Sequence, residues 1–205
     1  MRALRRILAH ELRAMHSLAL WVARRRHGVA PGHSAAYTGP QTAMMYGFIF
    51  VSVVETVALA VLVPWPLVQA ITLVIDVYGV LLMVALHASC VTRPHLVGPD
   101  GSLRIRYGAL FDLRIRADEI VGARVERRYP EGRLIQPRGD GSLDLIVADQ
   151  TTVAVELAAP VRSVRPLGKQ GRARVVRFHA DDPKALVHAL TQVRTAPSPS
   201  PGPPV

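Results

Sequence analysis

The sequence is poor in several residue types that particular functions need. It has one cysteine, Cys90, among 205 residues, so no disulfide can form within the chain and a secreted disulfide scaffold is excluded. Only 5% of the residues are aromatic, and they are not clustered as a base-stacking platform requires, which argues against nucleic-acid binding. The chain has no glycine-rich phosphate loop, nucleophile elbow or His-Glu-x-x-His pair. We therefore expect no enzymatic activity and no cofactor.

Basic residues are missing from the middle of the chain, where two long apolar segments lie on either side of Pro64-Trp65-Pro66. The first covers residues 42–63 and the second 67–91, and each exceeds the roughly 20 apolar residues needed to cross a membrane. A chain in lipid must satisfy its own backbone hydrogen bonds, so both segments should be helices. Because the prolines cannot continue a helix, the sequence predicts an antiparallel hairpin over residues 42–91.

Basic residues flank this hairpin on both sides. Residues 1–42 contain seven arginines and one glutamate, and the chain after Val91 contains 18 basic and 12 acidic residues. Lys and Arg close to the ends of membrane spans stay in the cytoplasm. We therefore expect a cell-membrane protein with both termini in the cytoplasm, a placement that depends on Arg24, Arg25, Arg26 and Arg93.

The N-terminal residues 1–27 combine apolar side chains at helical spacing with arginines, which is typical of a basic amphipathic helix. Two placements fit this pattern. The helix either lies on the inner leaflet, with Trp21 at headgroup depth, or packs on the protein's own cytoplasmic part. Residues 28–41 contain three glycines and two prolines, which predicts a linker into the first span.

After residue 91 the pattern changes to the alternation of apolar and charged residues that is typical of strands. Residues 103–107 and 111–115 place apolar side chains on one face, and Gly108-Ala109 makes the turn between them. Turns rich in Gly, Pro and Asp separate the other expected strands, which are residues 95–97, 119–128, 143–148, 152–157 and 174–178.

A closing helix should follow these strands. It begins at Asp181-Asp182-Pro183, where an acidic residue suits the N-cap and proline suits the first turn. Its apolar side is formed by Leu186, Val187, Leu190 and Val193. Residues 195–205 are mainly proline and serine, have nothing to bury, and should be disordered.

The run Leu-Arg-Ile-Arg-Tyr-Gly-Ala-Leu-Phe-Asp-Leu-Arg-Ile from Leu103, with Ala-Asp-Glu-Ile-Val-Gly-Ala-Arg-Val from Ala117, resembles the opening of bacterial pleckstrin-homology-like (PH-like) domains. So does Val-Val-Arg-Phe-His-Ala-Asp-Asp-Pro-Lys-Ala-Leu from Val175. The whole chain resembles two-span integral membrane proteins of high-GC bacteria with such a domain in the cytoplasm. The resemblance implies a barrel of about seven strands over residues 92–194, capped by the C-terminal helix, and supplies no catalytic residue. The fold class is then a membrane α-helical hairpin plus an α+β, mainly β, domain.

Each apolar segment has one acid near its middle, Glu55 in the first and Asp76 in the second. In a hairpin the two lie at the same depth, roughly 15 Å into the membrane at 1.5 Å per residue. An ionised carboxylate there costs about 2.5–3.5 kcal/mol, so both should face protein or water. Polar residues on the same helix faces predict contacts across the hairpin or across a homo-oligomer seam, and they are Ser52, Gln69, Thr72 and His87.

Two interpretations of Glu55 and Asp76 remain open. Two carboxylates in contact do not both ionise easily, so the pair would hold a proton and serve a proton or cation pathway. Alternatively, the acids are protonated and form hydrogen bonds that fix the register of the helices.

Two groups of basic residues in the C-terminal part are candidate contacts for anionic lipid headgroups, together with Arg24, Arg25 and Arg26. The first group should line the outer face of the hairpin formed by residues 103–115, and the second should crowd a later loop. The two groups are Arg104, Arg106, Arg114 and Arg116, and Arg162, Arg165, Lys169 and Arg172. The alternative is an ordinary solvated surface.

No metal is expected, because His87, Cys90 and His95 match no strong zinc spacing. The sequence thus predicts a non-catalytic membrane protein that presents a PH-like binding or scaffold module at the inner leaflet, with membrane lipid and an unidentified protein as partners. The alternative is a small oligomeric transport or proton-sensing subunit in which Glu55 and Asp76 act.

Overall fold

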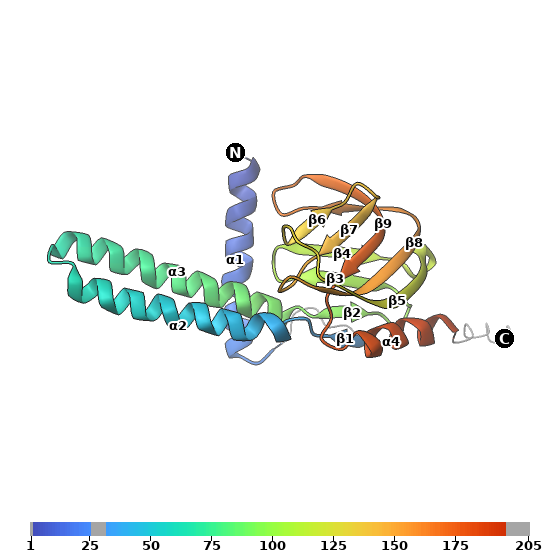
Figure 1. The fold of residues 1–205 in the computed structure, drawn as a ribbon, viewed down its shortest axis with the longest axis horizontal. Coiled ribbons are helices and arrows are strands. Elements are labelled where there is room, and N and C mark those ends of the chain that lie inside the picture. The colour runs from blue at the N-terminus through green and yellow to red at the C-terminus, as the bar shows by residue number, and fades with distance from the viewer. Residues whose placement is uncertain (1, 26–31, 196–205) are drawn as a thin grey trace, which may run out of the picture.

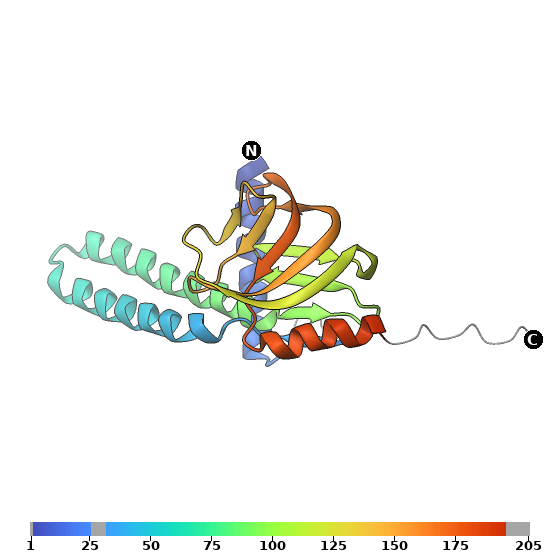
Figure 2. The ribbon, with the colours of Figure 1, turned by 45° about the vertical axis from the view of Figure 1, so that its right-hand side comes forward.

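The computed structural model describes residues 2–25 and 32–195, with the backbone alone for residues 2–4, 6, 7, 194 and 195. A helical hairpin projects away from a pair of β-sheets, and a third helix lies crosswise where the two parts meet (Figures 1 and 2). The elements in chain order are α1 (Arg2–Val22), β1 (His33–Ala35), α2 (Gly39–Leu62), α3 (Pro66–Thr92), β2 (His95–Val97), β3 (Leu103–Tyr107), β4 (Phe111–Ile115), the 3-10 turn η1 (Ala117–Glu119), β5 (Ile120–Arg128), β6 (Ile135–Pro137), β7 (Ser142–Leu145), β8 (Thr151–Val164), β9 (Gln170–Phe178) and α4 (Pro183–Thr195).

The hairpin consists of α2 and α3, and both helices are long and apolar enough to cross a membrane. Their most apolar stretches have mean hydropathies of 2.1 and 2.2, and none of the residues in those stretches is buried inside the protein. Each helix has a proline at its start, where the missing N–H is not needed. The two long apolar helices predicted from the sequence are therefore present.

Nine described strands form two sheets. The first sheet has the order β1-β2-β3-β4 and is antiparallel throughout. The second has the order β5-β8-β9-β7-β6, in which only the described pair β7–β9 is parallel. The first sheet thus begins with a strand that precedes the hairpin, so the hairpin is inserted between β1 and β2.

The sequence predicted a barrel of about seven strands, whereas the described strands form two separate sheets and no closed barrel. Among the described residues no ladder joins β4 to β5, because the chain turns through η1 after Ile115 and β5 pairs with β8. Two strands were also missed. β1 lies within the expected linker 28–41, and β6 lies in an expected loop; each is a three-residue strand whose place is fixed by its pairing, with β2 and with β7.

The core lies between the two sheets. Apolar side chains of β3 and β4, such as Ile105 and Leu113, pack with those of β8 and β9, such as Val155 and Phe178. The C-terminal helix α4 adds Leu186, which is fully buried, and Leu190. The Asp182 carboxylate accepts a hydrogen bond of 3.0 Å from the amide of Ala185, the N-cap that the sequence predicted.

Candidate anion-binding pocket

A cavity of about 290 Å³ lies where α1, the end of α3 and the β3–β4 hairpin meet. Four arginines line it, and we call it the arginine pocket. Arg13 comes from α1, Arg93 follows the last residue of α3, and Arg104 and Arg106 are on β3. Among the described lining residues the one carboxylate is Asp112 of β4. The formal charge on the lining is therefore strongly positive.

The strand β3 supplies two of these side chains because its residues alternate between the two faces of the sheet. Leu103 and Ile105 are fully buried in the core between the sheets, so Arg104 and Arg106 point to the opposite face. We expected that face to be exposed. Arg106 is instead only 2% exposed, because helices cover this part of the sheet, and this corrects the prediction.

A buried histidine is hydrogen-bonded to the backbone of Arg106. The imidazole of His95 donates from Nε2 to the carbonyl oxygen of His179 (2.9 Å), and its Nδ1 accepts from the amide of Arg106 (3.1 Å). These partners require a neutral ring with its proton on Nε2. Burial lowers the pKa of His95 to about 3, so the ring adds no charge at neutral pH. Tyr37 stacks on the ring at 4.5 Å.

Electrostatic repulsion is concentrated in this pocket. Burial lowers the pKa of Arg93, and the charge of Arg13 lowers it further. Burial likewise lowers the pKa of Arg106, with Arg104 as the next cause. A guanidinium stays protonated at any working pH, so these shifts report the cost of holding the charges together. The buried Nε of Arg93 has no hydrogen-bond partner in the described part of the chain.

Asp112 neutralises only part of this charge. Its Oδ1 accepts from Nε of Arg104 at 2.8 Å in a bidentate ion pair. That hydrogen bond raises the pKa of Arg104. Four guanidinium groups and one carboxylate leave a formal excess of three positive charges around the cavity. Arginine forks match the geometry of phosphate and carboxylate oxygens, so the pocket is suited to an anion.

The helix α1 closes one side of the pocket. It packs across α3 and buries Ala14 and Ser17 completely. Both ring nitrogens of His10 face carbonyl oxygens, that of Ala109 at 2.9 Å and that of Pro166 at 3.1 Å. His10 therefore ties α1 to the β3–β4 turn and to the β8–β9 turn.

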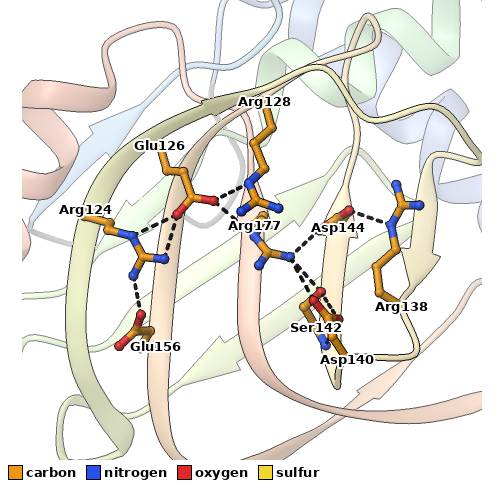
Figure 3. A network of polar contacts seen from close by, with 9 residues as sticks. All are labelled: Arg124, Glu126, Arg128, Arg138, Asp140, Ser142, Asp144, Glu156 and Arg177. Carbon is orange, nitrogen blue, oxygen red and sulfur yellow. Dashed lines mark hydrogen bonds and ion pairs between the residues drawn. The ribbon is translucent and has the colours of Figure 1, made fainter.

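A second polar cluster, the strand network, lies on the other sheet and differs in its charge balance (Figure 3). Arg177 of β9 is 8% exposed and contacts Asp144 at 3.3 Å, Glu126 at 3.5 Å and the hydroxyl of Ser142 at 2.7 Å. Arg138 contacts the other oxygen of Asp144 at 2.8 Å. The members are four arginines, Arg124, Arg128, Arg138 and Arg177, four acids, Glu126, Asp140, Asp144 and Glu156, and Ser142. Because these charges balance, the network fastens strands and has no charge left to attract an ion.

The remaining predicted headgroup contacts are spread over the surface. Arg114 and Arg116 are exposed, as are Arg24 and Arg25, while Arg26 lies outside the described residues. The second basic group is on a β-hairpin and not in a loop: Arg162 of β8 lies directly opposite Arg172 of β9, and Arg165 and Lys169 are at the turn. The strands extend further than predicted, to Val164 and from Gln170, which explains this difference.

Glu55 and Asp76, the acids near the middles of the two apolar helices, are not brought into contact. In the described part of the chain no hydrogen bond or ion pair joins Glu55 to Asp76. Glu55 is exposed, whereas Asp76 is half-buried and its buried Oδ2 has no hydrogen-bond partner among the described residues. A direct proton-sharing pair within one hairpin is therefore not what the structure contains.

The polar residues expected to support those acids have mostly local partners. Thr72 donates to the carbonyl of Val68 at 2.9 Å, and the carbonyl of Ser52 accepts from Thr56 at 2.8 Å. Gln69 is different, because its side-chain amide donates to the carbonyl of Ala60 across the hairpin. His87 is buried against the edge of Trp21, with ring centroids 6.4 Å apart, so it joins α1 to α3.

Sequence reasoning missed Arg13 and Arg93 as site residues. Arg13 was one of several arginines on an amphipathic helix, and Arg93 served only to assign the topology. Their meeting depends on how α1 crosses α3, a contact between distant parts of the chain. The one available signal was that Arg93, Arg104 and Arg106 lie within 14 residues of one another, directly after an apolar span.

No group of three His, Cys, Asp or Glu side chains that would hold a metal ion occurs among the described residues. Comparison of the chain with protein-family models, with curated proteins and with solved structures found no match.

Proposed function

We propose that this chain is a non-catalytic membrane protein: α2 and α3 cross the membrane as a hairpin, and the two sheets form a binding or scaffold module against the inner leaflet. The arginine pocket is the binding site of that module. The observation that carries the proposal is the position of the pocket, immediately after the last residue of an apolar helix long enough to span a membrane. At that point a span would emerge into the headgroup layer.

The exposed surface of the hairpin supports this placement. Large apolar side chains are exposed along both helices, among them Phe50 at 69% and Val74 at 68%. Contiguous apolar surface of this extent is unfavourable in water and is expected where lipid covers it. The basic residues on both sides of the hairpin support cytoplasmic termini.

The orientation of α1 independently supports the placement of the hairpin across the membrane. Tyr78 of α3 donates to the Glu11 carboxylate, so this side of α1 faces along the hairpin. Arg13, about 200° further around the helix, faces the sheets. Leu8 (50% exposed) and Val22 (74% exposed) lie on the side of Glu11. A helix that lies crosswise to the hairpin (Figure 1) and turns exposed apolar residues toward it fits the surface of a bilayer.

The architecture of the module is the basis for its PH-like assignment within this proposal. Two facing sheets enclose one core, and a C-terminal helix packs at β1 and β5. The run from Phe178 into α4 follows the pattern on which the resemblance was based. The mechanism we propose is recruitment, in which the hairpin holds the module at the lipid surface and the module binds its ligand there.

Cysteine accessibility in intact cells tests the topology. Cys90 is buried, and a Cys90→Ala background removes it. A cysteine in place of Trp65, in the exposed turn between α2 and α3, should react with an impermeant maleimide from outside, and one in place of the exposed Lys169 should not. Labelling of the Lys169 position from outside, or release of the chain from membranes by alkaline wash, would refute the proposal.

One observation favours a second candidate, a small oligomeric transport or proton-sensing subunit. The buried Oδ2 of Asp76 has no hydrogen-bond partner among the described residues, and such an atom is costly unless a proton, a water molecule or another subunit meets it. Proton flux into liposomes should then fall in Asp76→Asn and Glu55→Gln. If flux is absent in the parent protein, the acids only hold helices together.

A further inference from the structure

We infer that the ligand of the arginine pocket is a phosphate group, and that α1 is the part of the site that the phosphate secures. This rests on the proposed function and names the ligand class of its binding site. The inference combines three observations: the unbalanced charge of the pocket, the buried position of Arg106, and the contribution of α1 through a single basic side chain.

The charge and shape of the pocket select the ligand. Four guanidinium groups surround a space of about 290 Å³, and the one carboxylate among the described lining residues, Asp112, is hydrogen-bonded to Arg104. A phosphate monoester carries nearly two negative charges at neutral pH and three terminal oxygens, so it can accept from several arginines at once. A carboxylate offers one charge and two oxygens, and it leaves more of the repulsion uncompensated.

The side of the pocket formed by β3 and the turn after it is held by several contacts. The amide of Arg106 is bonded to His95, and Gly108 lines the cavity with a φ of +48°, where a β-carbon would clash with Ser89 Oγ. The amide of Gly108 donates to the Tyr37 hydroxyl at 2.7 Å. The side formed by β3 is therefore held in place, and ligand binding has little reorganisation to drive there.

The wall formed by α1 is different. Arg13 is exposed, and its charge repels Arg93 at the end of α3. With the cavity empty this repulsion opposes the packing of α1 on α3. A phosphate between the two side chains turns the repulsion into attraction to a shared anion. Phosphate binding and the docking of α1 are therefore coupled, and each strengthens the other.

The phosphate group can come from two sources, an inner-leaflet lipid or a soluble phosphate. The position of the pocket at the end of α3, a helix long and apolar enough to span a membrane, favours the headgroup of a lipid. The experiment separates the two sources.

The test uses the full chain in nanodiscs and follows hydrogen exchange of the α1 backbone over residues 8–22. Nanodiscs of phosphatidylcholine alone are compared with nanodiscs that contain phosphatidic acid, and inorganic phosphate is titrated separately into the first kind. We expect phosphate or phosphatidic acid to slow exchange in α1, while sheet strands such as β8 change little. Slowing only with phosphatidic acid identifies a lipid, and slowing with inorganic phosphate at low concentration identifies a soluble ligand.

Matched variants decide the outcome. Arg13→Gln should weaken the response to phosphate at least about tenfold, and Arg106→Gln by at least as much. Arg5→Gln, an exposed arginine on the same helix, and Arg114→Gln, exposed on the neighbouring strand, should change it less than about twofold. Arg13 is exposed, so its variant tests the site even if Arg106→Gln fails to fold.

The inference is overturned if phosphate and phosphatidic acid leave the exchange of α1 unchanged, or if Arg13→Gln and Arg5→Gln respond alike. Failure of the proposed function has a different result, because it would appear in the cysteine labelling of positions 65 and 169, which does not depend on phosphate.

Discussion

The arginine pocket and the strand network each contain four arginines, and they differ in what faces those arginines. In the network four carboxylates and a serine hydroxyl meet the guanidinium groups, and in the pocket one carboxylate does among the described residues. The cavity beside the network is the larger of the two, about 450 Å³ against about 290 Å³. Charge balance therefore separates a structural cluster from a binding site here, and cavity size does not.

The comparison teaches that an arginine has to be judged by its neighbours. Arg177 and Arg106 are both buried and both on strands, with exposures of 8% and 2%. Arg177 lies between two acids, Glu126 and Asp144, and stabilises the sheet. Arg106 lies beside other arginines, and burial, followed by the charge of Arg104, lowers the pKa of its guanidinium.

A substitution that breaks the strand network should have the largest effect on stability. Arg177→Ala leaves the buried Asp144 with Arg138 alone, and we expect a loss of about 3 kcal/mol in the free energy of unfolding. Arg124→Ala, whose side chain is half exposed, is the matched control and should cost less than about 1 kcal/mol. Thermal unfolding of the full chain in detergent measures both. Equal losses would mean that burial does not distinguish the two ion pairs.

The second-largest effect should come from acidification, which removes the stability that the neutral His95 ring contributes beneath β3. The folded-state pKa of His95, about 3, lies below the ordinary value, so its contribution to stability is present above about pH 6.5 and falls as the pH drops toward 3. Between pH 7 and pH 5 we expect a loss of about 2 kcal/mol. The pKa of His179 is also lowered, by burial, and acts in the same direction. His95→Gln keeps a donor for the His179 carbonyl and should flatten the pH dependence; an unchanged slope would exclude His95 as its source.

Removal of one charge from the arginine pocket should cost less stability than Arg177→Ala. In Arg106→Met an apolar side chain replaces a cation that Arg104 repels, so the loss of stability in low-salt, phosphate-free buffer should be clearly smaller than that of Arg177→Ala. Added salt should stabilise the parent more than the variant, because it screens the repulsion only where the repulsion exists. Melting curves at several salt concentrations test this. A loss as large as that in Arg177→Ala would contradict the comparison.

The smallest effect on stability is expected for a variant that makes the arginine pocket more positive. Asp112→Asn removes the carboxylate that pairs with Arg104, and because both side chains are 40–49% exposed the loss of stability should be below about 1 kcal/mol. The affinity for phosphate should nevertheless rise about threefold, since the pocket becomes more positive. Calorimetric titration of phosphate into the reconstituted chain measures it, and a lower affinity would show that Asp112 orients Arg104 for the ligand.

Local patterns in the sequence predicted much of the fold. β2, β3 and β4 have the predicted bounds, and α4 begins at Pro183 behind the predicted acidic cap. These elements show themselves through alternation and capping within a few residues. β1 does not, because its place is fixed by pairing with β2, on the far side of the hairpin.

The arginine pocket was harder to predict than the strands, because it also depends on contacts between distant segments of the chain. Arg104 and Arg106 were identified as basic residues of a strand face, but their face is covered by α1, which precedes them by about 90 residues. Amphipathic spacing indicates that α1 has a buried side, and it does not indicate what covers that side. The pocket is a tertiary feature formed by contacts between segments that the hairpin separates.

Native mass spectrometry of the full chain, released from membranes that contain zwitterionic and anionic phospholipids, tests the central claim most directly. The account predicts that the parent chain and Arg114→Gln retain an anionic phospholipid and that Arg13→Gln and Arg106→Gln lose it. Equal retention by all four chains, or no retained anionic lipid on the parent, would contradict the claim that the arginine pocket binds a headgroup.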